Sequence, residues 1–185
     1  MYYFFLGFFT GLSLILAIGA QNVFVIEQGL KRQFTFLVCF VCSLSDLILI
    51  FIGILIFSFF QNYFTPLIEL ILNILLIIFL INFIWKKWNE KINRISLANI
   101  KNAESKLSIF LKTLSFTYLN PHVYSDTIFF MGNFSKNFMF GDKILFGIGA
   151  SLASFSFFFL IGYLANYFSH YLNSIKIWKI INNFI

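Results

Sequence analysis

The sequence predicts an all-α membrane protein, a polytopic bundle of five full transmembrane helices plus a short sixth, built as two inverted three-helix repeats. Of its 185 residues, 60% are hydrophobic and only 11% are charged, against about 45–50% and about 25% in an ordinary soluble domain. A soluble fold of this size could not hide so much apolar surface, including 29 Phe residues, because small domains bury only about two-thirds of theirs. The apolar runs are continuous, which disfavours a membrane β-barrel of alternating strands.

Each predicted span is an apolar run of roughly 20 residues, the length that crosses a bilayer. In chain order these runs cover residues 3–26, 34–60, 64–85, 107–131 and 144–168, and a shorter run covers 175–185. The short run rises only about 17 Å at 1.5 Å per residue, roughly half of a hydrocarbon core of about 30 Å. We therefore expect a truncated final helix.

A single transmembrane domain, residues 1–185, divides at one long polar segment. Residues 1–85 form the first three-helix repeat, residues 86–106 a basic cytoplasmic loop, and residues 107–185 the second repeat with its truncated last helix. The excess of Lys and Arg in the odd-numbered connections predicts that these are cytoplasmic and that the N-terminus is outside. Because three is odd, the second repeat starts on the opposite side of the membrane from the first. The net charge of +6 lies at span ends, so we interpret it as a topology signal and expect no nucleic-acid partner.

The first helix of each repeat carries a break at a corresponding position. The breaks are Gly19-Ala20-Gln21-Asn22 and Leu119-Asn120-Pro121-His122. Pro121 removes one backbone donor and frees the carbonyl four residues earlier, and irregular backbone in a membrane is tolerated only where protein or a water-filled cavity covers it. Broken helices at matching positions of inverted repeats are where substrate sites form near the bilayer midplane.

Two acids lie deep in the predicted spans, Asp46 and Asp126. A carboxylate at a helix centre costs about 2.5–3.5 kcal/mol on insertion scales, so it normally faces a bundle interior, a partner or water. Asp46 fits a cation site or a proton relay, or else an acid paired with a hydroxyl or a Lys of a neighbouring helix. Asp126 forms a polar cluster with Asn120 and Tyr124 around the proline break, which fits either a cavity lining or a simple packing kink.

The other polar groups in the spans each admit two interpretations. The amides of Gln21 and Asn22 can bind a substrate or form interhelical hydrogen bonds. His122 can shuttle protons near neutral pH or cap the helix at Pro121. Cys39 and Cys42 form a C-x-x-C pattern without a second ligand pair or a βαβ context, so packing is the expected role and a membrane thiol–disulfide carrier the rival. Small residues repeated every fourth position are expected to let helices approach closely; they are Gly7/Gly11, Gly147/Ser151 and Ala150/Ser154.

The motifs around both breaks resemble the L-lysine exporter (LysE) family, and its arginine exporter (ArgO) branch in particular. The resemblance is carried by residues 19–25 (GAQNVFV), 28–33 (QGLKRQ), Ser45-Asp46 and residues 118–127 (YLNPHVYSDT), and it covers most of the chain outside the basic loop. Position 20 departs from the family, since Ala stands where Pro is usual. This departure predicts that the first helix is broken by Gly19 alone or bends less.

The resemblance implies a secondary transporter that exports L-arginine or L-lysine across the bacterial inner membrane, driven by the proton or membrane potential, with no enzymatic activity, cofactor or metal. It implies a multi-pass protein whose partners are the bilayer, the basic amino acid and the proton as coupling ion, and a homo-oligomer is compatible with it. The site residues that it implies are Gln21, Asn22, Asp46, Asn120, Pro121, Tyr124 and Asp126. Other amino acids or a cation remain alternative substrates.

Overall fold

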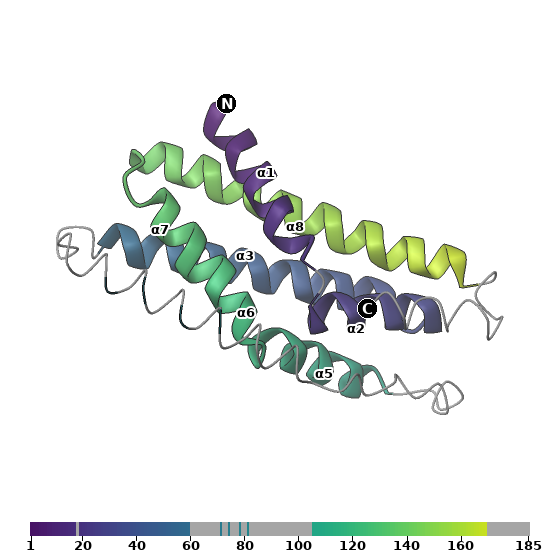
Figure 1. Ribbon diagram of the computed structural model, residues 1–185. Helices are drawn as coiled ribbons and strands as arrows, with labels where there is room; N and C mark the ends of the chain where they lie inside the picture. Colours follow the sequence, from purple (N-terminus) through teal and green to yellow (C-terminus); the bar gives the residue numbers. More distant parts are fainter. Residues whose placement is uncertain are drawn as a thin grey trace.

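The computed structural model describes residues 1–17, 19–59, 71, 74, 78, 81 and 105–169, and every element within these ranges is helical. The elements are α1 (Tyr2–Ile15), α2 (Ala20–Lys31), α3 (Thr35–Phe59), α5 (Lys106–Tyr118), α6 (Pro121–Tyr124), the π-helix η3 (Ser125–Met131), α7 (Gly132–Ser135) and α8 (Phe140–Phe168) (Figure 1). The predicted sixth helix and nearly all of the predicted third span and basic loop lie outside the described residues. The count of five full spans and the inverted repeat remain predictions.

Two long antiparallel helices, α3 and α8, form the centre of the bundle (Figure 1). Both are long and apolar enough to cross a membrane, which confirms the predicted spans 34–60 and 144–168, although α8 begins four residues earlier than expected. Three contacts fix their antiparallel register. The Cys39 thiol donates a hydrogen bond to the Phe158 carbonyl, and the Ser154 hydroxyl donates one to Asp46. The Lys143 ammonium donates one to the Ser58 hydroxyl.

The first predicted span is two helices and not one. Helix α1 ends at Ile15, α2 begins at Ala20 with Gly19 as its N-cap residue in an extended conformation, and the two axes differ by 81°. The predicted break is present, and it lies at Gly19. Counting α1 and α2 as one broken span, the described residues contain up to three membrane crossings.

The second predicted break also lies where the sequence places it. Helix α5 ends at Tyr118, and Asn120 caps α6, which begins at Pro121. Proline suits this first helical position because its missing N–H would have no partner there anyway. The chain then continues through the π-helix η3, a wider turn that is rare in proteins and frequent at functional sites.

Glycines let α1 and η3 lie directly on the central helices. A Cβ atom built at Gly149 of α8 would collide with the Phe4 carbonyl of α1, and one built at Gly7 would collide with the Phe146 carbonyl. On α3, a Cβ at Gly53 would lie 2.6 Å from the Ile128 Cα of η3. The close approach predicted from the small-residue pattern is therefore confirmed for α1 against α8.

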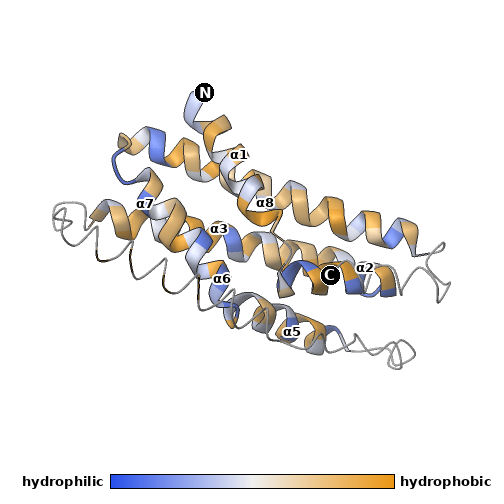
Figure 2. Ribbon diagram, viewed as in Figure 1, coloured by the Kyte–Doolittle hydropathy of each residue, from blue (hydrophilic) through white to orange (hydrophobic). Residues whose placement is uncertain are grey.

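The polarity of the bundle is that of a membrane protein. Hydrophobic residues predominate along α3 and α8 (Figure 2). Many large apolar side chains of these helices are exposed, whereas many buried side chains are hydroxyls. Two apolar clusters lie along α3. One surrounds Cys39, Cys42 and Phe158, and the other surrounds Ile50, Ile54 and Phe146. Asp46 lies between them, four residues from Cys42 and four from Ile50, so all three share one face of α3.

Replacing Gly149 by Ala is expected to destabilise the protein by about 1–3 kcal/mol, the cost of overpacking a tight contact. Gly141→Ala is the matched control, since both glycines are in α8 and a Cβ at Gly141 meets nothing within 4 Å. Both changes carry the same intrinsic preference of Ala for helix, so their difference isolates the packing. Unfolding of the purified protein in detergent, followed by circular dichroism, measures it. Equal stability of the two variants would contradict the close packing of α1 on α8.

Candidate functional site

The two helix breaks face each other across a cavity of about 60 Å³. A cavity needs about 10–15 Å³ by this measure to hold one water, so this space holds a few waters or a small polar group. The polar residues that line it come from α2, α3, α8 and the second break. They are Gln21, Asn22, Asp46, Ser154, Asn120, His122, Asp126 and Thr127.

Asp46 is the most buried acid of this cavity, with 6% of its surface exposed. Its Oδ2 accepts a hydrogen bond of 2.6 Å from the Ser154 hydroxyl, while its Oδ1 is buried without a hydrogen-bond partner. The pairing with a neighbouring hydroxyl that the sequence allows is therefore present on one oxygen only. A buried acceptor without a partner costs about 1–3 kcal/mol, and here it lines a cavity that a ligand can enter.

Gln21 supplies the complementary group. Its side chain is 5% exposed and interacts with the Asp46 carboxyl, although no hydrogen bond of 3.5 Å or less joins its Nε2 to Oδ1 of Asp46. An unpaired acceptor on α3 and an unpaired donor on α2 thus line the same cavity. A ligand that carries both a cationic donor and an acidic acceptor would satisfy both.

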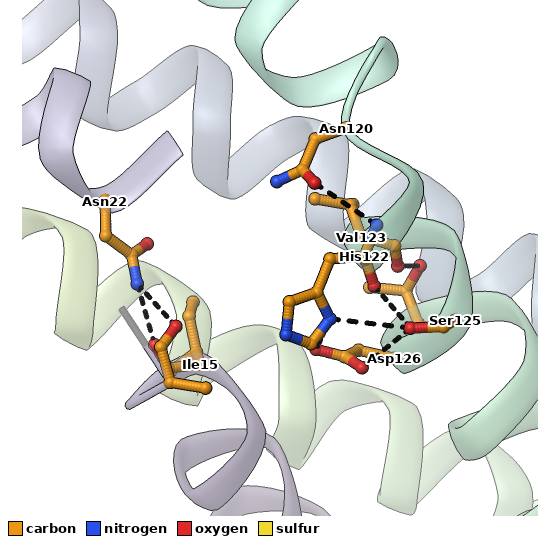
Figure 3. Close-up of polar contacts among 9 residues, drawn as sticks. Ile15, Asn22, Asn120, His122, Val123, Ser125 and Asp126 are labelled. Carbon is orange, nitrogen blue, oxygen red and sulfur yellow. Dashed lines mark hydrogen bonds and ion pairs between the residues drawn. The ribbon is translucent and has the colours of Figure 1, made fainter. Parts of the chain in front are cut away.

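Asn22 stabilises the main chain at the first break by hydrogen bonds. Its Nδ2 donates to the Ile15 carbonyl at 2.9 Å and to the Ala17 carbonyl at 3.2 Å (Figure 3). These carbonyls belong to the end of α1, where helical partners are missing. Because both N–H bonds are used by the main chain, we do not propose Asn22 as a donor to a substrate carboxylate.

Tyr124 stabilises the main chain at the second break in the same way. Its hydroxyl donates to the carbonyl of Tyr118, the last residue of α5, at 2.8 Å. Asn120 completes the break, because its Oδ1 accepts from the backbone N–H of His122 at 3.2 Å. Its Nδ2 lies beside Gly19 of the first break. Pro121 is exposed and sets the backbone without lining the cavity.

His122 and Asp126 form an ion-pair contact on the cavity wall. The Nδ1 of His122 lies 3.0 Å from Oδ2 of Asp126, and each side chain is a little over one-fifth exposed. The Ser125 hydroxyl donates to the His122 carbonyl at 2.8 Å, and its oxygen also lies 3.1 Å from Oδ1 of Asp126. Figure 3 shows this cluster on one side of the space and Asn22 on the other. Among the described residues, no group of three or more His, Cys, Asp or Glu could hold a metal ion.

The two cysteines are core residues. Cys39 and Cys42 are free and essentially unexposed, and the Cys39 thiol donates to the Phe158 carbonyl at 3.2 Å. Disulfide exchange needs a sulfur that a partner can reach. Burial therefore favours the packing role that the sequence suggested.

Of the seven residues predicted for the site, five line the cavity, and Pro121 and Tyr124 do not. The sequence-based site omitted His122 and Ser154. His122 could have been included from its spacing, because residues four apart share a helix face and Asp126 is four residues away. Ser154 carries no such signal, since only the register of α8 against α3 brings its hydroxyl to Asp46.

Comparisons with known proteins identify the family of the chain. The family model described as LysE type translocator matches residues 12–185. The chain belongs to this family.

Among curated proteins, the arginine exporter protein ArgO of Pectobacterium carotovorum subsp. carotovorum (strain PC1) is 33% identical over 184 residues. The protein of the same name from Serratia proteamaculans (strain 568) is 32% identical over 181 residues. Each alignment covers 97% of this chain and 88% of the relative. No solved structure matches the chain significantly. Membership of the LysE family, together with the apolar helices, makes this a membrane protein of a translocator family.

In this LysE family member, Tyr124→Phe is expected to lower the free energy of unfolding by about 0.6–1.5 kcal/mol, because one buried hydrogen bond to the end of α5 is lost. Tyr163→Phe is the matched control, since Tyr163 of α8 is 47% exposed and should give no change. Unfolding titrations of the purified variants in detergent measure both. If the two variants were equally stable, Tyr124 would not hold the second break.

Proposed function

We propose that this protein is a secondary transporter that exports basic amino acids, L-arginine or L-lysine, across the bacterial inner membrane, driven by the proton gradient or the membrane potential. The unpaired Oδ1 of Asp46 carries the proposal, because it is a buried acceptor on the wall of a cavity between two helix breaks. Membership of the LysE family supports it, as do relatives named arginine exporter.

The chemistry of the cavity matches a basic amino acid. Such a molecule carries an α-carboxylate, an α-ammonium and a cationic side chain. Asp46 would accept from one of the two cationic groups, and a guanidinium is the best donor for a carboxylate because its planar fork can form two parallel bonds. The unpaired Nε2 of Gln21 and the Nδ2 of Asn120 would donate to the α-carboxylate.

A second carboxylate lines the same cavity. Asp126 belongs to η3 and Asp46 to α3, and both are part of the cavity lining. Like charges that share a site disfavour one another unless a cation lies between them. Two carboxylates therefore suit a substrate with two cationic groups better than one with a single ammonium.

The fold suggests how the cavity would open alternately to each side. In transporters with broken helices, one part of the bundle rocks against another around a fixed site near the midplane. Here α1 and α2 lie along α8, whereas η3 and α7 lie along α3. The cavity is between these two pairs, so a change in the packing of α3 against α8 would open it.

A neutral amino acid or an inorganic cation is the alternative substrate. The second carboxylate favours a basic amino acid over both, because each alternative brings a single positive charge. Competition assays with export-competent cells separate these cases. Arginine and lysine should compete with the exported substrate, whereas a neutral amino acid and a monovalent cation should not.

Asp46→Asn is expected to abolish arginine export. Losing one partner of a buried, hydrogen-bonded charge pair costs about 2–5 kcal/mol, which is roughly 30-fold to 5,000-fold in affinity. The measurement is arginine and lysine efflux from dipeptide-loaded cells, with the amount of protein in the membrane quantified in parallel.

Asp142→Asn is the matched control for this experiment. Asp142 is an acid in the first turn of α8, outside the cavity lining, and its replacement should leave efflux near the level of the unmodified protein. Efflux retained by the Asp46 variant would remove Asp46 from the binding site.

Replacing Cys39 and Cys42 together by Ser is expected to leave arginine efflux intact, because both thiols are buried in the apolar cluster of α3 and α8. A thiol–disulfide carrier would lose its activity with the same double substitution. Arginine efflux by the variant in the cell assay decides between the two functions, and loss of efflux from protein that is still present in the membrane would favour the carrier.

A further inference from the structure

Among the described residues, four buried side-chain atoms have no hydrogen-bond partner, and all four belong to α2 and α3. Gln21 and Asp46, which we call the inner pair, line the cavity. Gln28 and Thr35, which we call the outer pair, are outside its lining and only 1% and 6% exposed. Buried polar groups normally have partners, so the unpaired Oε1 of Gln28 and Oγ1 of Thr35 need an explanation that the cavity does not give.

The outer pair lies in line with the inner pair. Gln28 follows Gln21 by seven residues on α2, which is close to two full turns, so both share one face of that helix. On α3, Thr35 and Cys39 are four residues apart, and Cys39 and Asp46 seven, so these three also share a face. Gln21 interacts with Asp46, and therefore the two faces meet at the cavity.

Both members of the outer pair are held close to Gly162 of α8. A Cβ atom built at Gly162 would lie 3.3 Å from Cγ2 of Thr35, and one built at Gly29, the neighbour of Gln28, would collide with the Gly162 carbonyl. The outer pair is thus a second polar location, at the end of the bundle where α2 is followed by α3.

The segment between the two pairs is apolar and closed in this structure. It consists of Val25 on α2 and of Cys39 and Cys42 on α3, and we call these three residues the strip. All three are essentially unexposed and belong to one apolar cluster. Ile109 of α5 belongs to the same cluster, so α5 covers the strip.

We infer that the substrate passes along the strip between the cavity and the end of the bundle, and that the outer pair binds one of its cationic groups on the way. This inference rests on the proposed function and assigns a path and a second binding site to it. An amide oxygen and a hydroxyl oxygen are acceptors, which an ammonium or guanidinium group needs. Neither is charged, so they would hold the cation more weakly than Asp46, and a site on a transport path must release as well as bind.

Helix α5 is the element that would uncover the strip. It ends at Tyr118, directly before the second break, and it meets the cluster through side chains such as Ile109. Helix α2, in contrast, lies on α8 with backbone against backbone at Gly29 and Gly162. Movement of α5 at the break would bring water to Cys39 and Cys42, where a thiol can ionise and react.

The first test replaces the outer pair by Gln28→Met and Thr35→Val together, which removes both acceptors with little change in volume. Arginine efflux from dipeptide-loaded cells, per molecule in the membrane, should fall about tenfold or more, because hydrogen bonds to a charged group are worth that much in affinity. The unfolding midpoint in detergent should stay the same or rise, since the atoms removed have no partner in the closed state. Efflux equal to that of the unmodified protein would overturn the inference.

Ser135→Ala is the control for this double variant. Ser135 of α7 is also fully buried, but its hydroxyl already donates to the Met131 carbonyl at 2.8 Å. Its loss removes a buried hydroxyl away from the strip, so efflux per molecule should equal that of the unmodified protein.

The second test keeps the inference testable if the double variant does not fold. Cys39 and Cys42 are the two cysteines of the chain, so any maleimide bound to the protein reports on the strip. In liposomes that contain the full chain, N-ethylmaleimide should modify them faster with arginine than without it, as the mass of the intact protein measures. Asp46→Asn should react slowly in both conditions, because no bound substrate favours opening.

The outcomes separate the path from the proposed function. If the unmodified protein exports arginine but its thiols react no faster in the presence of arginine, the substrate does not pass the strip and the inference is overturned. If the unmodified protein exports no arginine, the proposed function itself fails.

Discussion

The structure depends on one constraint, which is that the backbone groups freed at a helix break must find partners inside the bilayer. Two side chains supply such partners in the same way. Asn22 reaches back to the last carbonyls of α1, and Tyr124 reaches back to the last carbonyl of α5. In each case the donor comes from the helix after the break and the acceptor from the helix before it. The breaks are thereby held open, and the chain can bend by 81° between α1 and α2 without leaving these carbonyls unpaired.

The cavity is a consequence of these two breaks and of the tight packing on either side of them. Glycine contacts place α1 directly on α8 and η3 directly on α3, and the two apolar clusters pack on either side of Asp46. At the level of Asp46 the shortened helices leave a cavity, and polar side chains line it. A transporter of a charged molecule needs both an apolar exterior in contact with lipid and a polar site inside the bundle that water can reach.

The two acids of the cavity are paired differently. Asp46 has one oxygen on the Ser154 hydroxyl and one without a hydrogen bond, whereas Asp126 contacts the imidazole of His122. Under the proposed function, the oxygen of Asp46 that has no hydrogen bond is the first acceptor that a cationic group of the substrate would bind.

The sequence by itself determined the helical membrane class, the spans that became α3 and α8, both helix breaks and the depth of the two acids. These follow from the local run of apolar residues and from Gly19 and Pro121, whose effects act within a few positions. The tertiary structure alone decided that Asn22 and Tyr124 serve the backbone and that Ser154 binds Asp46. These hydrogen-bond partners depend on how segments that are not adjacent in the chain pack against each other. Ser154 and Asp46 are 108 positions apart, so no local sequence pattern predicts their contact. Hydropathy is a property of a stretch of chain, whereas a hydrogen bond is a property of two atoms that packing brings together.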